Sequence, residues 1–174
     1  MDRRSFLKSS LGVAAGIMLP TGALATIIKP RELCFYHTHT GERIEIEYTP
    51  GNYRGPVRHA LEDFLRDFRT GEKHAFDPNL FDSLCAIQDC CRKQASFEII
   101  SAYRSPKTNA LLRKNSSGVA RKSFHMQGRA IDIRVTELPT SMLRDLAMNL
   151  HNGGVGYYPK SDFIHIDTGP KRNW

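Results

Sequence analysis

The sequence predicts an α+β fold in which helices flank an antiparallel β-sheet. Short runs of β-forming residues are interspersed with longer runs that have apolar residues at helical spacing. Several strand-like runs lie only a few polar residues apart, which favours hairpin returns. Of the 174 residues, 40% are hydrophobic and 25% are charged, an ordinary balance for a chain with one hydrophobic core.

The first predicted element is a hairpin. Residues 33–37 and 43–48 are rich in β formers, and the polar residues 38–42 form the turn between them. Asp77-Pro78 predicts a helix start, because an acid at the N-cap and a proline in the first turn both favour one. The other expected elements, in chain order, are a helix at 57–68, a strand at 97–102, a helix opening at 105–106, a loop at 114–123, a strand at 130–135, a helix at 139–150, and strands at 154–158 and 163–167.

Residues 1–25 have the three parts of an export signal. Residues 3–8 read RRSFLK, a twin-arginine opening, and residues 11–24 are mostly apolar. Ala23 and Ala25 then provide the small side chains that a signal peptidase requires. The apolar stretch falls short of the roughly 20 residues of a membrane span. The alternative is an ordinary amphipathic N-terminal helix. We expect twin-arginine export to the periplasm, cleavage near Ala25 and a mature domain of residues 26–174 with no stable membrane span.

The charge of the mature chain is modest. Cleavage after Ala25 would remove three basic residues and one acidic residue, so that the formal net charge of +7 becomes +5. Such a surplus favours an anionic polymer such as the cell wall, or it is only a solvated surface. We expect no nucleic-acid partner, because aromatic and basic residues are not interleaved and no nucleic-acid motif is present.

The four cysteines are Cys34, Cys85, Cys90 and Cys91. None has C-x-x-C spacing, which argues against a zinc ribbon or a thioredoxin-type site. Twin-arginine export usually carries proteins that have folded in a reducing compartment, so we expect buried thiols. A single bridge from Cys34 to the helix that carries the other three remains the alternative.

Two segments carry residues suited to metal chemistry. Residues 123–132 read SFHMQGRAID, and alternation along the predicted strand places Asp132 on its polar face. Gly128 allows the preceding loop to bend so that His125 approaches Asp132. In the second segment, residues 162–167 (DFIHID), His165 points away from the core. Two imidazoles and one carboxylate suit Zn²⁺ and leave a fourth position for water, although a lone histidine is more often a surface or core residue.

The first segment resembles the S-x-H-x-x-G-x-A-x-D signature of the peptidases grouped with lysostaphin, the D-Ala-D-Ala peptidases and the hedgehog domain. Residues 162–165 resemble their acid-x-x-His element. Residues 101–105, 123–134, 153–158 and 163–169 together resemble the murein endopeptidase K group of periplasmic proteins, over about residues 33–174. The resemblance implies a hedgehog/D-Ala-D-Ala-peptidase-like fold and one zinc ion per chain, bound by His125, Asp132 and His165.

Four further residues have candidate roles, and the resemblance suggests those of Asp162 and Arg104. Asp162 is at the position of a general base in several relatives, many of which have glutamate there; otherwise it is a turn acid. Arg104 would stabilise an oxyanion or form an ordinary salt bridge. Asp167 would orient a metal ligand or cap a turn. Ser123 would shape the ligand loop, since it has no triad partner that would make it a nucleophile.

The leading functional prediction is a zinc metallopeptidase of 26–174 that hydrolyses peptide cross-links between peptidoglycan stem peptides and acts as a monomer. The rival is a non-catalytic zinc module that binds the cell wall or a partner. A third reading is a D,D-carboxypeptidase or dipeptidase, which keeps the chemistry and changes the substrate. His37 and His39 have a spacing that could chelate a metal, but no third ligand is near, so we expect surface histidines.

Overall fold

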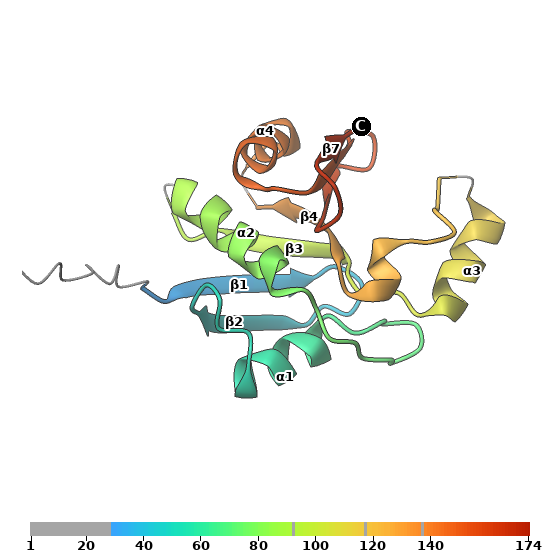
Figure 1. The fold of residues 1–174 in the computed structure, drawn as a ribbon, viewed down its shortest axis with the longest axis horizontal. Coiled ribbons are helices and arrows are strands. Elements are labelled where there is room, and N and C mark those ends of the chain that lie inside the picture. The colour runs from blue at the N-terminus through green and yellow to red at the C-terminus, as the bar shows by residue number, and fades with distance from the viewer. Residues whose placement is uncertain (1–28, 92, 117, 137) are drawn as a thin grey trace, which may run out of the picture.

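The computed structural model describes residues 29–174 except 92, 117 and 137; the predicted export signal lies outside this part. Four helices and a seven-stranded sheet form one α+β unit (Figure 1), which confirms the predicted class. The elements are β1 (Arg31–His37), β2 (Arg43–Tyr48), α1 (Gly55–Phe64), α2 (Pro78–Cys90), β3 (Ser96–Ser101), α3 (Pro106–Asn115), the 3-10 helix η1 (Phe124–Gln127), β4 (Ala130–Val135), α4 (Thr140–Leu150), β5 (Gly154–Tyr158), β6 (Phe163–Asp167) and β7 (Arg172–Asn173).

The sheet is mixed, whereas the sequence suggested an antiparallel one. Its strand order is β2-β1-β3-β4-β6-β5-β7. Four neighbouring pairs are antiparallel, but β1 runs parallel to β3 and β5 runs parallel to β7. The first parallel pair arises because the chain between β1 and β3 contains α1 and α2 as well as β2, a connection long enough to return to the same end of the sheet.

Local signals explain most helix boundaries. The Asp77 carboxylate accepts the N–H of Asn79 at the start of α2, and the Ser105 hydroxyl accepts that of Thr108 at the start of α3. Helix α1 ends at Phe64, short of the predicted 57–68, because the chain beyond it turns back. This turn buries Asp67, whose carboxylate accepts backbone N–H groups from Arg69 and Ser105.

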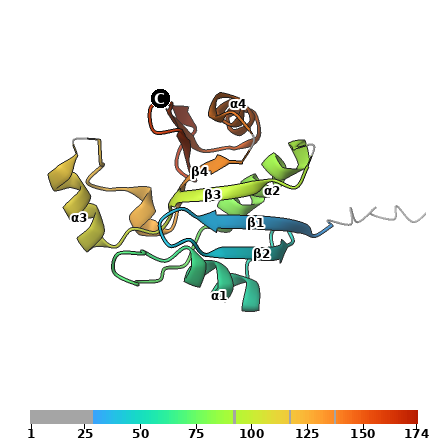
Figure 2. The same cartoon turned by 180° about the vertical axis from the view of Figure 1, so that it is seen from behind.

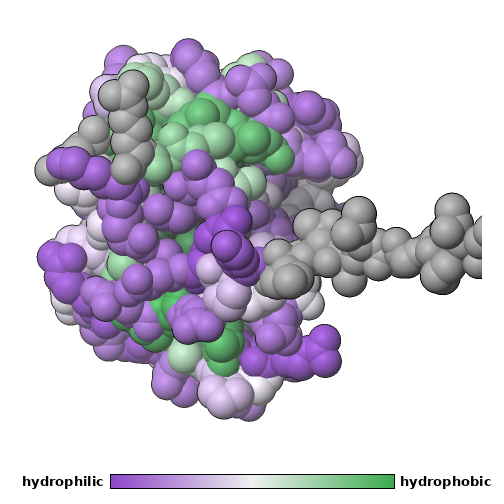
Figure 3. All heavy atoms as spheres, turned by 90° about the vertical axis from the view of Figure 1, so that its left-hand side faces the viewer, coloured by the Kyte–Doolittle hydropathy of each residue, from purple (hydrophilic) through white to green (hydrophobic). Residues whose placement is uncertain are grey.

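Within the part of the chain that the structure describes, one face of the sheet carries the core and none of the four α-helices covers the other face. Alternate residues such as Ile131, Ile133 and Val135 pack beneath α2 and α4. From behind, β1, β2 and β3 lie in front of α1 and α2 (Figure 2). Helix α3 projects beyond the ends of the strands (Figures 1 and 2). Hydrophilic side chains cover most of the opposite end of the molecule (Figure 3). Within the described residues, no helix is long and apolar enough to cross a membrane.

Two expectations about single residues need correction. His37 is buried, because it takes the inward position that follows Leu33 and Phe35 along β1; its Nδ1 accepts the N–H groups of His39 and Thr40 in the hairpin turn. All four cysteines are free, so the alternative bridge from β1 is absent. The expectation of buried thiols holds only for Cys85. Cys34 and Cys91 are partly exposed, and Cys90 is exposed.

Candidate metal centre

His125 is positioned by the loop before β4. The Ser123 hydroxyl caps η1 by accepting the backbone N–H of His125. Gly128 then turns the chain with a φ of +62°, and a Cβ at this position would lie 2.0 Å from the carbonyl oxygen of Ala75. Both the left-handed backbone and the close approach require glycine. The loop therefore closes tightly and buries His125 against β4.

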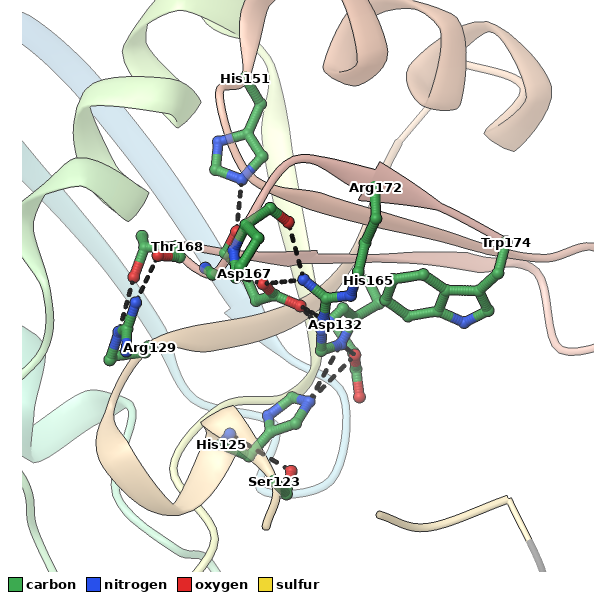
Figure 4. Close-up of polar contacts among 12 residues, drawn as sticks. Ser123, His125, Arg129, Asp132, His151, His165, Asp167, Thr168, Arg172 and Trp174 are labelled. Carbon is green, nitrogen blue, oxygen red and sulfur yellow. Dashed lines mark hydrogen bonds and ion pairs between the residues drawn. The ribbon is translucent and has the colours of Figure 1, made fainter.

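Asp132 and His165 lie side by side on neighbouring strands. They are paired in the β4–β6 register and share the sheet face that carries no helix. His125 approaches this pair from η1 (Figure 4). Its Nε2 lies 3.2 Å from His165 Nδ1 and 3.2 Å from Asp132 Oδ1, and the latter two atoms are 2.7 Å apart. The structure thus brings together the three predicted ligands.

The other imidazole nitrogens face oxygen atoms. His125 Nδ1 lies 2.7 Å from the carbonyl oxygen of Ala102, and His165 Nε2 lies 2.9 Å from Asp167 Oδ2. Because these oxygens are acceptors, each of these nitrogens carries the proton. In the neutral rings the lone pairs of His125 Nε2 and His165 Nδ1 therefore point toward Asp132, which is the orientation that metal-binding histidines adopt.

The three donor atoms fit a divalent metal ion, since they all lie within 4.8 Å of one another. Zinc bonds of about 2.0–2.2 Å in a tetrahedral arrangement place donor atoms roughly 3.3 Å apart. The two separations from His125 Nε2 are close to this value at 3.2 Å, and the third, between His165 and Asp132, is shorter at 2.7 Å. Three protein donors leave one coordination position for another ligand, as in catalytic zinc sites. The donor chemistry and spacing are therefore compatible with a metal site that keeps one position open.

The electrostatics of the cluster favour a cation. Burial raises the pKa of Asp132, but the neighbouring His125 and His165 outweigh it and hold this pKa far below its usual range. Burial lowers the pKa of His125. Burial also acts to lower the pKa of His165, but hydrogen bonds to Asp132 and Asp167 outweigh burial and raise this pKa to about 9. Two ionised carboxylates thus stabilise positive charge at this point.

Asp167 is fully buried and holds His165 in place. Arg172 donates to both of its carboxylate oxygens, at 2.6 and 3.0 Å, and Gly169 donates its N–H at 2.9 Å. The sequence left two alternatives for Asp167, a cap in a turn or a contact with a predicted metal ligand. Both contacts are present, the first with Gly169 and the second with His165. His151 also contacts this residue, since its Nε2 lies 2.8 Å from the Asp167 carbonyl oxygen. These contacts of Arg172 and His151 could not be predicted from the sequence, because neither residue belongs to a motif.

Arg104 lies beside the metal cluster and contacts Asp132. Its Nη2 donates to Asp132 Oδ2 at 2.6 Å and its Nε donates to Ser101 at 2.8 Å. The salt bridge that the sequence allowed is therefore present. Among the described residues Arg104 Nη1 donates to no protein acceptor, and the residue lines the cleft, so this nitrogen is available to a ligand.

The cluster forms the floor of an open cleft of about 500 Å³. One wall consists of Ser116, Gly118, Val119, Ala120 and Lys122. The other wall is aromatic. It consists of Tyr158 and Phe163, whose rings stack at 4.6 Å, and Trp174, whose indole N–H donates to the Tyr158 hydroxyl. The metal centre is therefore accessible to an elongated ligand.

The structure does not bring Asp162 into this cleft. It lies in the turn between β5 and β6 with a φ of +51°. Its carboxylate accepts a hydrogen bond from Thr140 and lies 3.7 Å from Arg134, in a separate depression. Asp162 precedes His165 by three residues, an odd number, so strand alternation does not place the two on one face. The geometry therefore gives no support to Asp162 as the general base.

Comparisons with known proteins identify the family of this chain. A family model described as peptidoglycan L,D-endopeptidase MepK matches residues 25–174. The chain is 43% identical to the peptidoglycan L,D-endopeptidase MepK of Escherichia coli K12, over 99% of this chain and 97% of that protein. It is 45% identical to the probable peptidoglycan L,D-endopeptidase MepK of Haemophilus influenzae, over 94% of this chain and 90% of that protein. The chain therefore belongs to the MepK family of peptidoglycan endopeptidases.

Proposed function

We propose that this protein is a zinc-dependent peptidase that hydrolyses L,D peptide cross-links between the stem peptides of peptidoglycan. The observation that carries the proposal is the convergence of three metal-donor atoms on the floor of an open cleft. The L,D specificity follows the names of the relatives, and the family membership supports the endopeptidase class. The bound zinc would polarise the scissile carbonyl and lower the pKa of a water molecule.

The residues of the chain have three tasks in this reaction. His125, Asp132 and His165 hold the metal, and the Ala102 carbonyl and Asp167 fix the two imidazole rings. Arg104 is ion-paired with Asp132 and offers its free Nη1 to the carbonyl oxygen as negative charge develops there. The cleft walls align the peptide, so that its carbonyl lies over the metal centre.

The location follows from the substrate. Peptidoglycan lies outside the cytoplasmic membrane, so we infer a periplasmic protein that is exported by its twin-arginine segment and cleaved near Ala25. The mature chain of residues 26–174 would be the zinc peptidase domain and would act as a monomer.

Zinc content and cleavage, measured on the same preparation, test the proposal. Mature protein should contain about one zinc per chain and release uncross-linked fragments from L,D-linked muropeptides, detected by mass spectrometry. His165→Ala should lose both properties, whereas His59→Ala, which removes an exposed imidazole outside the site, should keep both. Metal-free protein with full activity would refute the zinc centre. Zinc-loaded protein that cleaves no muropeptide would favour a binding module, and cleavage only of a terminal residue would favour a carboxypeptidase.

A further inference from the structure

The basic residues of the chain are unevenly distributed. Between Glu98 and Asp132 there are seven basic residues and no acid. Five of the seven lie in residues 106–122, which comprise α3 and the loop after it and which we call the basic arm. The rest of the predicted mature chain, residues 26–105 and 123–174, contains 17 basic and 17 acidic residues. The whole positive surplus of the mature protein therefore lies in the arm.

The five cations of the arm are exposed to solvent: Lys107, Arg113, Lys114, Arg121 and Lys122. None of them has an ion-pair partner among the described residues, whereas the flanking Arg104 and Arg129 are paired with Asp132 and Asp77. From residue 110 to residue 122 no described residue is buried. The arm is tied back by Asn109, whose amide donates to the Ala120 carbonyl. Its charges thus form no ion pair within the part of the protein that the structure describes.

Helix stabilisation explains only part of this pattern. Arg113 and Lys114 are in the last turn of α3, where positive charge is favourable. Lys107 is in the first turn, where the helix dipole disfavours a cation. Arg121 and Lys122 follow the helix. Three of the five cations therefore have no role in the stability of α3.

The arm is continuous with the catalytic cleft. Its returning segment, including Lys122, forms one wall of the cleft opposite the aromatic wall. Helix α3 extends this wall outward, beyond the ends of the strands (Figures 1 and 2). A polymer that lies in the cleft and continues past this wall passes over the cations of the arm.

We propose that the basic arm is a docking surface for a polymer that carries repeated carboxylates, and that this polymer is the peptidoglycan strand whose cross-link lies in the cleft. The inference rests on the proposed substrate but concerns binding outside the cleft. A membrane surface fits the arm less well. Helix α3 has only ten residues, its buried residues are the polar Thr108 and Asn109, and Leu111 is its one strongly exposed large apolar side chain. A helix that lies on a membrane needs a larger apolar face.

Binding to insoluble peptidoglycan tests the proposal without the need for turnover. The arm variant combines Arg113→Gln, Lys114→Gln and Arg121→Gln; it spares Lys122, which lines the cleft. The matched control combines three changes at exposed residues elsewhere: Lys29→Gln, Arg54→Gln and Lys93→Gln. Both variants lose three positive charges. At about 20 mM salt the arm variant should bind at least about tenfold more weakly than the parent and the control, and this difference should vanish near about 500 mM salt.

Two further measurements separate the possible outcomes. Cleavage of a small soluble muropeptide dimer by the arm variant should stay within about twofold of the parent, because the cleft is intact. Equal binding of the arm and control variants to peptidoglycan would overturn the docking surface. Arm-dependent binding to vesicles of anionic phospholipid, without such binding to peptidoglycan, would overturn the assignment of the partner. If the parent binds through the arm but cleaves nothing, docking stands and the proposed activity fails.

Discussion

Replacement of Asp167 by asparagine tests how the protein holds its metal. The carboxylate accepts the Nε2–H of His165 at 2.9 Å and thereby keeps the Nδ1 lone pair directed at Asp132. Asparagine has nearly the same shape but no charge, and one of its two terminal atoms is a donor. Loss of such a partner typically weakens metal binding about 10–100-fold, which is roughly 1.4–2.7 kcal/mol. We expect zinc affinity to fall by this factor.

The same substitution should leave the protein folded. Asparagine keeps one acceptor for Arg172, whose side chain is 40% exposed and is therefore partly hydrated. The loss of stability should be about 1–2 kcal/mol, less than the roughly 5–15 kcal/mol by which domains are stable. Thermal unfolding of the metal-free protein should confirm a cooperative transition. Competition with a zinc chelator at pH 7 then gives the affinity.

Asp162→Asn is the matched control, since it makes the same chemical change outside the cleft. It should retain zinc affinity and cleave cross-linked muropeptides within about threefold of the parent, because its carboxylate contacts Thr140 and Arg134. If Asp167→Asn binds zinc as tightly as the parent, the orienting role is refuted. If Asp162→Asn keeps zinc but loses about 10²- to 10⁴-fold in turnover, Asp162 is the base after all and must move into the cleft during the reaction.

Three other predictions follow from individual residues. Arg104→Ala should lower kcat about 10²-fold or more while part of the zinc is retained; an unchanged kcat would remove the oxyanion role. Changing both Arg3 and Arg4 to lysine should leave uncleaved precursor in the cytoplasm, and normal processing would refute twin-arginine export. Burial acts to raise the pKa of Asp67, but hydrogen bonds from groups that include Ser105 outweigh burial and lower this pKa. The ionised carboxylate therefore stabilises the fold above about pH 4, and this stabilisation is lost as the pH falls further. Asp67→Asn should therefore be less stable at pH 7 and lose less stability in acid, as measured by urea unfolding at several pH values.

The sequence predicted the elements whose signals are local. Strands β4 and β6 were correctly predicted because their alternation is regular, and α2 because its proline and N-cap are adjacent. Strand β7 was not predicted. It has only two residues and exists because Arg172 and Asn173 pair with β5, a contact that no periodicity encodes. The parallel pairing of β1 with β3 was missed for the same reason, since it depends on how a long connection packs.

The proximity of the predicted ligands His125 and Asp132 could be deduced from the sequence because their motif spans the loop and the strand that bring them together. His125 and Asp132 are seven residues apart, and Gly128 between them allows the loop to close. Roles that depend on long-range packing could not be deduced in this way. Arg172 reaches Asp167 only after the segment beyond β6 has folded back beside β5. The prediction for Asp162 rested on resemblance, and the turn conformation that directs its side chain away from the cleft is not visible in the motif.

The register of the sheet links the fold to the chemistry. One cross-strand row runs from Ser101 through Asp132 and His165 to Gly156. A shift in register between Ile99 and Ser101 brings Ser101 opposite Asp132.

Each member of this row has a task at the site. Ser101 accepts a hydrogen bond from Arg104, and the central pair offers two of the candidate metal donors. The glycine at the last position leaves room for the Trp174 ring, since a Cβ at Gly156 would lie 2.6 Å from it. A slip of one residue between β4 and β6 would turn His165 toward the core while Asp132 stayed on the open face. The hydrophobic pattern that buries Ile164 and Ile166 therefore also fixes the geometry of the metal centre, so that core packing and catalysis depend on the same register.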